Sequence, residues 1–267
     1  MRTQMSHRLM ALIRNNQTAK RAYSLQTSEA EATVYVYDVI DPFWGVSASQ
    51  FVKDLAGLTQ PTIHVRINSP GGDVFEARAM ATAMRNHPSK IVAHIDGLAA
   101  SAASYIATAA SEVEISDGAF LMIHQAWSIA GGNAGDFRSM ADLLDKIDGE
   151  LVREYAAETG QTAAQIAEWM AAETWMTADE AIANGFADRK AAEFKTADAN
   201  WNLDVYDKAP AALRETVSTS TTITINGPVA GEGDLLKVIR ESVDRDAMLV
   251  AESFPQYEAA LRLARTL

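Results

Sequence analysis

The chain has 267 residues, of which 48% are hydrophobic and 22% are charged, as in a soluble globular protein with one core and some length left for a tail. Its net charge of -12 argues against a surface that binds nucleic acid or an anionic membrane. The sequence has no cysteine, which excludes disulfides, cysteine zinc sites and thiol nucleophiles and is compatible with a cytoplasmic protein. No stretch approaches the roughly 20 apolar residues of a membrane helix, so we expect no membrane partner.

Residues 1–30 are polar and mixed in composition, and they predict a loosely held N-terminal arm. From Ala32 onward, β-branched and aromatic runs alternate with segments whose apolar residues recur every three or four positions. The runs predict strands at 32–40, 62–67, 91–95, 112–115 and 119–123. The other segments predict helices at 46–58, 74–86, 136–158 and 163–171. This alternation indicates an α/β fold with a mainly parallel sheet.

The stretch 96–110, DGLAASAASYIATAA, predicts a tight turn at Gly97 followed by a helix of small residues. Close packing of that helix against the sheet would be reason enough for its composition. A serine in its first turn, Ser101, would also lie beside unpaired N–H groups and the positive end of the helix dipole, which favour a developing negative charge. Ser101 is therefore a candidate nucleophile for acyl transfer.

Loops that leave the carboxyl ends of parallel strands build the functional site, and here they are expected at 68–73, 96–101 and 124–135. His124 directly follows an apolar strand and opens the third loop, which is the position of a general base that faces a cleft. The other histidines have plainer interpretations, in the arm, within strands or at a helix end: His7, His64, His87 and His94.

A serine hydroxyl needs further groups before it becomes a useful nucleophile. It needs a base within hydrogen-bonding distance, a third group that orients the base, and N–H donors for the oxyanion. The pair Gly71-Gly72 offers backbone that can approach a substrate closely, although such a pair also forms simple turns. The N–H groups at the start of the Ser101 helix offer a second donor.

Several motifs in one order resemble the ClpP-type serine proteases, the proteolytic subunits of the Clp system. They are INSPGGDVFEA at 67–77, DGLAASAASYIA at 96–107, LMIHQA at 121–126, GGNAGD at 131–136, YAAETGQT at 155–162 and AETWMTADEAIANGFAD at 172–188. The resemblance covers about residues 32–190. It implies a ClpP/crotonase-like fold of repeated ββα units with a parallel sheet and a helical handle.

The resemblance also implies roles for single residues. Ser101 is similar to the nucleophile and His124 to the base of these proteases, and the oxyanion donors resemble the backbone N–H groups of Gly72 and Ala102. Ser104, one helical turn after Ser101, is expected to be a packing residue.

The acid of the triad is where the sequence departs from the family pattern. The family usually has Asp before an aromatic-hydrophobic-Ser/Thr-Ala run, and here Glu173 precedes TWMTA in the matching position. A glutamate can orient a histidine with a longer arm. Asp136 and Asp179 remain alternatives, and Glu173 could also be a surface carboxylate at a helix end.

The resemblance implies a homo-oligomer of stacked heptameric rings, with the active sites inside a chamber. An apolar stripe from Phe137 to Tyr155 matches the handle that joins two rings. Gly131 and Gly132 would pair with the backbone of a peptide or unfolded protein substrate as an added strand. No ligand cluster or phosphate-binding loop is present in the sequence, so we expect no metal and no cofactor.

The organisation expected from the sequence is an arm at 1–30, a protease domain at 31–194 and a linker with a tail at 195–267, which includes a possible helix at 234–250. The altered arm and the extra tail resemble the phage and prophage branch of the family, whose members mature capsids. The partner would then be an ATP-driven unfoldase or a capsid or scaffold protein, in the cytoplasm of a bacterium or infected host or within a procapsid.

Three alternatives stay open. A crotonase-like enzyme on the same fold would bind a CoA thioester with the same oxyanion geometry and would not need His124 paired with Ser101. A signal-peptide-peptidase-like enzyme would use a Ser-Lys dyad and a membrane anchor. An inactive shell component would keep the fold without the chemistry, which the replacement at Glu173 and the long tail would allow.

Overall fold

The computed structural model describes residues 8–16, 22–128, 130–192 and 201–214. The chain divides into two units, 1–218 and 219–267, and the described residues all belong to the first. The helix predicted at 234–250 therefore lies outside the described residues.

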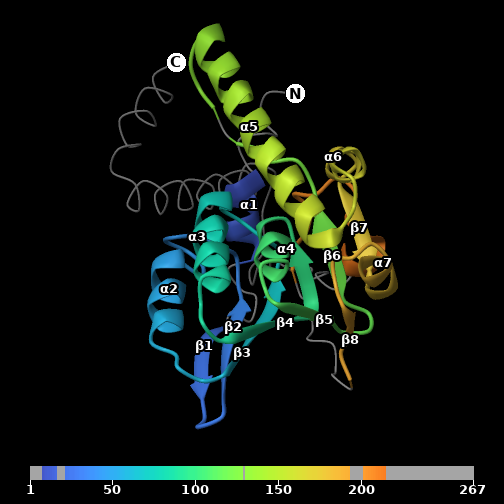
Figure 1. Ribbon diagram of the computed structural model, residues 1–267. Helices are drawn as coiled ribbons and strands as arrows, with labels where there is room; N and C mark the ends of the chain where they lie inside the picture. Colours follow the sequence, from blue (N-terminus) through green and yellow to red (C-terminus); the bar gives the residue numbers. More distant parts are fainter. Residues whose placement is uncertain (1–7, 17–21, 129, 193–200, 215–267) are drawn as a thin grey trace, which may run out of the picture. The chain divides into compact units, whose positions relative to one another are not determined.

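The described strands form one eight-stranded, mostly parallel sheet, which confirms the predicted α/β class (Figure 1). The order is β1-β2-β3-β4-β5-β8, with β6 beside β4 and β7 beside β6. The antiparallel pairs are β1 with β2 and β6 with β7. The strands are β1 (Ala22–Thr27), β2 (Glu31–Tyr37), β3 (Thr62–Ser69), β4 (Lys90–Ala100), β5 (Glu112–Ile115), β6 (Phe120–Ile123), β7 (Thr174–Thr177) and β8 (Arg189–Lys190).

The helices begin and end largely where the sequence places capping residues. The Thr177 and Glu180 pair forms a reciprocal capping box, and Gly160 ends the longest helix with φ 73°, a conformation that glycine adopts without strain. The described helices are α1 (Arg8–Asn15), α2 (Ala48–Ala56), α3 (Val74–Arg85), α4 (Ala102–Ala107), α5 (Ala134–Thr159), α6 (Ala163–Ala171), α7 (Ala178–Ala183) and α8 (Ala211–Arg214).

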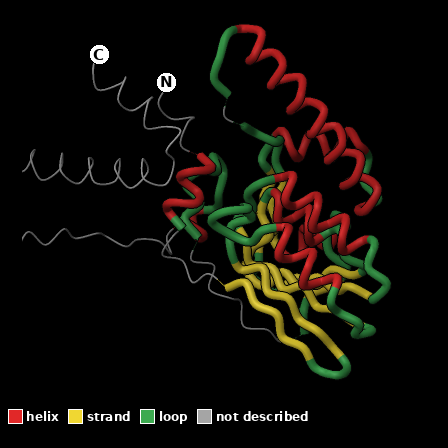
Figure 2. Tube along the Cα trace, turned by 90° about the vertical axis from the view of Figure 1, so that its left-hand side faces the viewer, coloured by secondary structure: helices red, strands yellow, loops and turns green. Residues whose placement is uncertain are grey.

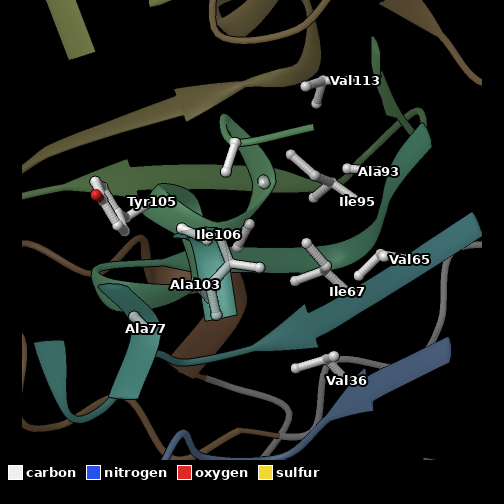
Figure 3. Packing of buried hydrophobic residues seen from close by; sticks show 14 of the residues in the cluster. Val36, Val65, Ile67, Ala77, Ala93, Ile95, Ala103, Tyr105, Ile106 and Val113 are labelled. Atoms are coloured by element: carbon white, nitrogen blue, oxygen red, sulfur yellow. The ribbon is translucent and has the colours of Figure 1, made fainter. Parts of the chain in front are cut away.

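One face of the sheet carries the main core. Figure 2 shows helices lying over this face of the sheet. Alternate residues of the central strands point to it and pack with residues of α2, α3 and α4. In Figure 3, Ile67 and Ile95 lie near Ala103 and Ile106 of α4. The small residues of α4 thus let it lie close to the sheet, as the sequence predicted.

The opposite face of the sheet is polar at one end and apolar at the other. At the polar end Arg66 of β3 makes a two-point ion pair with Asp96 of β4. At the apolar end a second buried cluster packs on Leu98 and Met122. Its other buried members come from α1, from the loop after β2, from the last residue of β4 and from the segment after residue 200. They are Leu12, Ile13, Val39, Ala100, Trp201, Leu203, Val205, Tyr206 and Ala209.

Both ends of the first unit are therefore more integrated than the sequence predicted. Residues 1–30 were expected to be a loose arm, but α1 contributes buried Leu12 and Ile13 and β1 pairs with β2. Residues after 194 were expected to be linker and tail, but Trp201 is 2% exposed. These contacts form because α1 and residues 201–209 cover apolar side chains of β4 and β6.

The structure corrects the predicted turn at Gly97. Strand β4 runs through this residue to Ala100, and α4 is only six residues long. The first part of β4 pairs with β5 and its end, from Leu98 to Ala100, pairs with β6. Because backbone pairing continues past Gly97, the small residues there extend a buried strand.

Helix α5 extends away from the sheet along most of its length (Figure 1). Its carboxyl-terminal part is anchored by buried Leu151 and Tyr155. In its first half, Phe137 is 52% and Leu143 is 43% exposed. The apolar stripe predicted from Phe137 to Tyr155 is therefore covered at one end only by the described residues of this chain.

Candidate active site

Ser101 lies at a sharp turn between β4 and α4. Its φ of 55° and ψ of −125° are a backbone conformation that residues other than glycine rarely adopt. The turn is held because the Ser101 N–H donates to the carbonyl of Met122 on β6 at 2.8 Å. The serine leaves the sheet plane and lines a pocket beside α4.

His124 is the first residue after β6, as predicted. Its Nε2 atom lies 2.7 Å from the Oγ atom of Ser101. The contact follows from the fold, because β4 and β6 are hydrogen-bonded neighbours and both residues leave the same end of their strands. A neutral imidazole in this position can accept the hydroxyl proton.

The Gly71-Gly72 turn lies against the start of α4. A Cβ atom added to Gly71 would lie 2.8 Å from Cβ of Ser101 and 3.1 Å from the nitrogen of Ala102. Gly72 and Ile40 form a parallel β-bridge. In it the N–H of Ile40 donates to the carbonyl of Gly71, and the N–H of Asp73 donates to the carbonyl of Ile40. In such a bridge the N–H of Gly72 itself points to the other side, away from Ile40.

Glycine is required at this turn for two reasons. The φ angles of Gly71 and Gly72 are 92° and 148°, which side chains disfavour. A Cβ atom on Gly72 would also lie 2.0 Å from the carbonyl oxygen of Ile40. The pair thus lets the backbone at Ile40 and at the Ser101 turn approach closely, and close approach to a substrate stays a prediction.

Glu173 immediately precedes β7, with φ 49°. The β6–β7 register pairs Met122 with Trp175 and ends with Ile123 opposite Thr174. Glu173 and His124 are the residues next to this last pair, where the positive φ of Glu173 ends the extended strand. One oxygen of the Glu173 carboxylate accepts from the indole of Trp175 at 3.1 Å and the N–H of Lys208 at 2.7 Å, and the other accepts from the N–H of Asp207 at 3.1 Å.

The two alternative acids have other roles. Asp136 forms the capping box at the start of α5 with Asn133. Asp179 is 80% exposed and pairs with Lys190 at 2.9 Å. The structure thus accounts for both carboxylates without His124.

Comparison with known proteins identifies the family of the chain. Residues 17–193 match the Clp protease family. The chain belongs to this family. It is 32% identical over 151 residues to ATP-dependent Clp protease proteolytic subunit 3 of Rhodococcus jostii, covering 55% of this chain and 74% of the relative. It is 31% identical over 164 residues to proteolytic subunit 1 of Protochlamydia amoebophila, covering 58% and 78%.

A further relative, proteolytic subunit 1 of Leifsonia xyli subsp. xyli, is 33% identical over 128 residues, which covers 47% of this chain and 65% of the relative. The family match ends at residue 193, so the segment 201–214 lies beyond it.

The pocket beside Ser101 in this Clp family member has a volume of about 440 Å³. Gly72, Ser101, Ala102 and His124 line it from the sheet side, and apolar residues of α5 line it from the other: Met140, Leu143, Leu144, Ile147 and Leu151. The part of the third loop that lines it is 126–128. Gly131 and Gly132 are both exposed, and Gly132 lies in a bend just before α5.

Sequence reasoning missed Tyr206. Its ring lies edge-on to His124, with centroids 5.5 Å apart, and edge-on to Trp175 at 5.7 Å. The apolar alternation of Trp201, Leu203 and Val205 signals a buried segment, but it follows a polar stretch that reads as a linker.

The described residues contain neither a metal-binding cluster of side chains nor a membrane-spanning helix. No group of three or more His, Cys, Asp or Glu side chains there is arranged to hold a metal ion. In the same part of the chain, no helix is both long and apolar enough to cross a membrane.

Proposed function

We propose that this Clp family member is a serine-type endopeptidase that hydrolyses peptide bonds through Ser101, His124 and Glu173. The observation that carries the proposal is the 2.7 Å separation of His124 Nε2 and Ser101 Oγ at the edge of a pocket. A hydroxyl at that distance from an imidazole, on a strained turn, is the arrangement an activated nucleophile requires.

The proposed reaction has two halves. His124 takes the proton of Ser101 as Oγ attacks the substrate carbonyl, and the resulting oxyanion accepts from the N–H groups of Gly72 and Ala102. His124 then gives the proton to the leaving amine, which departs and leaves an acyl-serine. Water, deprotonated by His124, hydrolyses the acyl-serine and releases the carboxylic acid and free Ser101.

Glu173 is the proposed orienting acid. Its position beside the last β6–β7 pair, at the strand ends where His124 also lies, supports this role, and so do the N–H donors that fix its carboxylate. A glutamate has one more side-chain torsion than an aspartate, so these donors provide the restraint that the longer arm needs.

The proposed substrate is an extended peptide or unfolded protein, paired with the backbone at Gly131 and Gly132, and the proposed assembly is a homo-oligomer of stacked rings. Exposed Phe137 and Leu143 support self-association through α5. Because the relatives are named ATP-dependent, an ATP-driven unfoldase is a candidate partner. A capsid or scaffold protein in an infected cytoplasm is the partner that a phage maturation role would require.

Hydrolysis of a quenched fluorescent peptide by the full-length protein tests the proposal. Ser101→Ala should abolish turnover and leave the assembly size unchanged, whereas Ser111→Ala, at an exposed serine, should hydrolyse the peptide at the wild-type rate. Turnover of an acyl-CoA thioester in place of the peptide would support the crotonase-like alternative. An assembled protein that hydrolyses neither substrate would support the inactive shell.

A further inference from the structure

We propose that the turn 206–208, which lies beyond the family match, positions His124 and Glu173, with Tyr206 as its central positioning residue. This inference rests on the proposed peptidase function. The turn comes from a segment the family match does not include, so the site of this chain is built from more than the shared protease domain.

Tyr206 contacts two of the proposed catalytic residues. It is 3% exposed, and its hydroxyl donates to the carbonyl of Pro70, beside the Gly71-Gly72 turn, at 2.5 Å. The side chain of Ser101 also interacts with this hydroxyl. Its ring packs edge-on against His124 at an interplanar angle of 83°. An imidazole packed against a buried ring has little freedom to rotate away from Ser101.

The phenol of Tyr206 keeps its proton under all ordinary conditions. Burial raises the pKa of Tyr206 well above its ordinary value; the interaction with Ser101 lowers this pKa, and the charge of Glu173 raises it. The hydroxyl can therefore act as a donor throughout the pH range in which a peptidase works.

The two residues after Tyr206 hold the third proposed member. The N–H groups of Asp207 and Lys208 both donate to the Glu173 carboxylate. The Lys208 ammonium group also donates to the carbonyl of Ala172 at 2.5 Å, which fixes the turn against the residue before Glu173. One turn of the chain thus touches all three proposed members of the triad.

The attachment of the segment does not depend on the site. Trp201 is 2% exposed and its indole donates to the side chain of Asn68 at 3.1 Å. Leu203 and Val205 pack with Leu98 and Met122 in the second apolar cluster. A small change at Tyr206 should therefore leave the segment bound, which makes the residue testable on its own.

The test compares Tyr206→Phe and Tyr206→Leu with a matched control in the full-length protein. Tyr206→Phe removes the hydroxyl, with its hydrogen bond to Pro70, and keeps the ring. Tyr206→Leu also removes the ring. The control is Tyr23→Phe, which removes a tyrosine hydroxyl bonded to Asp54 at 2.7 Å, away from the site. The measurements are kcat and KM for the fluorescent peptide, the rate of fluorophosphonate labelling at Ser101, and the thermal unfolding midpoint.

We expect kcat and the labelling rate to fall by about 10-fold in Tyr206→Phe and further in Tyr206→Leu, with KM within about 2-fold of wild type. A merely structural role would not separate kcat from KM in a variant whose unfolding midpoint matches that of the control. Wild-type rates in both variants, or faster rates, would overturn the inference. A wild-type protein that neither hydrolyses the peptide nor reacts with the fluorophosphonate would instead overturn the proposed function.

Discussion

At the scale of single residues, unusual backbone marks the site. Among the described residues, the non-glycine positions with positive φ are Ser101 and Glu173. Each such conformation costs on the order of 1–3 kcal/mol and persists only when its surroundings impose it. That both belong to one candidate triad indicates that the strain is tied to the placement of these side chains.

The role of Glu173 is tested by its amide isostere. Glu173→Gln keeps the size of the side chain but cannot balance a protonated His124, so kcat should fall by about 100-fold or more. Glu168→Gln, at an exposed position of α6, is the matched control and should retain wild-type kcat. Steady-state peptide hydrolysis measures both. A Glu173→Gln enzyme within about 2-fold of wild type would show that another group orients His124.

A second residue-level prediction concerns His94 on the polar face of the sheet. Burial and the charges of Arg66, His64 and Arg189 lower the pKa of His94 to about 4 from its ordinary 6.5. Its Nε2 atom lies 2.8 Å from Nδ1 of His64, and its Nδ1 atom lies 3.0 Å from Glu114. Folded protein therefore keeps His94 neutral where the unfolded chain protonates it.

Because the unfolded state binds the extra proton, this group lowers stability as pH falls from 6.5 towards 4. Between pH 7.5 and 5 the loss should be about 2 kcal/mol. Urea unfolding of wild type and His94→Gln at both pH values measures it, since the variant lacks the titration. An equal loss in both proteins would contradict the prediction.

At the scale of elements, α5 is held by one carboxylate. Glu154 accepts from Arg78 at 2.5 Å, from Arg85 at 3.3 Å and from the hydroxyl of Tyr105, which joins α5 to α3 and α4. Its side chain is only 16% exposed. Glu154 is adjacent to Tyr155 and lies within one turn of Leu151, the two buried residues that anchor the same end of the helix.

Glu154→Gln should lower the free energy of unfolding by about 1–3 kcal/mol, because it leaves two guanidinium groups without their shared partner. Glu150→Gln is the matched control on the same helix. Glu150 is exposed and pairs with Arg153, three residues further along α5. This control should not change stability measurably. Denaturant unfolding decides the matter, and equal behaviour of the two variants would contradict the anchoring role.

Most elements could be predicted from their local patterns. Helix α6 has the predicted bounds, 163–171, because Thr162 caps it and its apolar periodicity is clear. Strands β1 and β7 were not predicted. Strand β1 lies in a polar stretch and is stabilised by pairing with β2, whereas β7 has only four residues and is stabilised by β6, a partner distant in sequence. The turn expected at Gly97 was wrong for the same reason, since pairing with β6 continues the strand.

At the scale of the whole molecule, the sequence predicted which strand ends lie side by side. It predicted less well which segments pack over those ends. Ser101 and His124 each follow a predicted strand, so topology alone brings them together. The position of Glu173 depends on the β6–β7 register, and the contacts of Tyr206 depend on the path of a segment after an uncharacteristic polar stretch. Neither feature has a local pattern that fixes it.

Self-association through α5 is also tested at this scale. Phe137→Glu with Leu143→Glu places charges on the exposed apolar part of the helix and should raise the dissociation constant of the assembly by at least about 10-fold. Ser139→Glu adds charge at an exposed polar position and is the control. Sedimentation velocity measures the assembly, and an unchanged species in the double variant would contradict this interface.

The most direct test of the central claim is fluorophosphonate labelling followed by peptide mapping on the wild type, Ser101→Ala and His124→Ala. The account predicts one adduct on the peptide that contains Ser101, no adduct there in Ser101→Ala and much slower labelling in His124→Ala. An unlabelled wild type of native assembly size, or labelling that persists in Ser101→Ala, would contradict an activated serine at this turn.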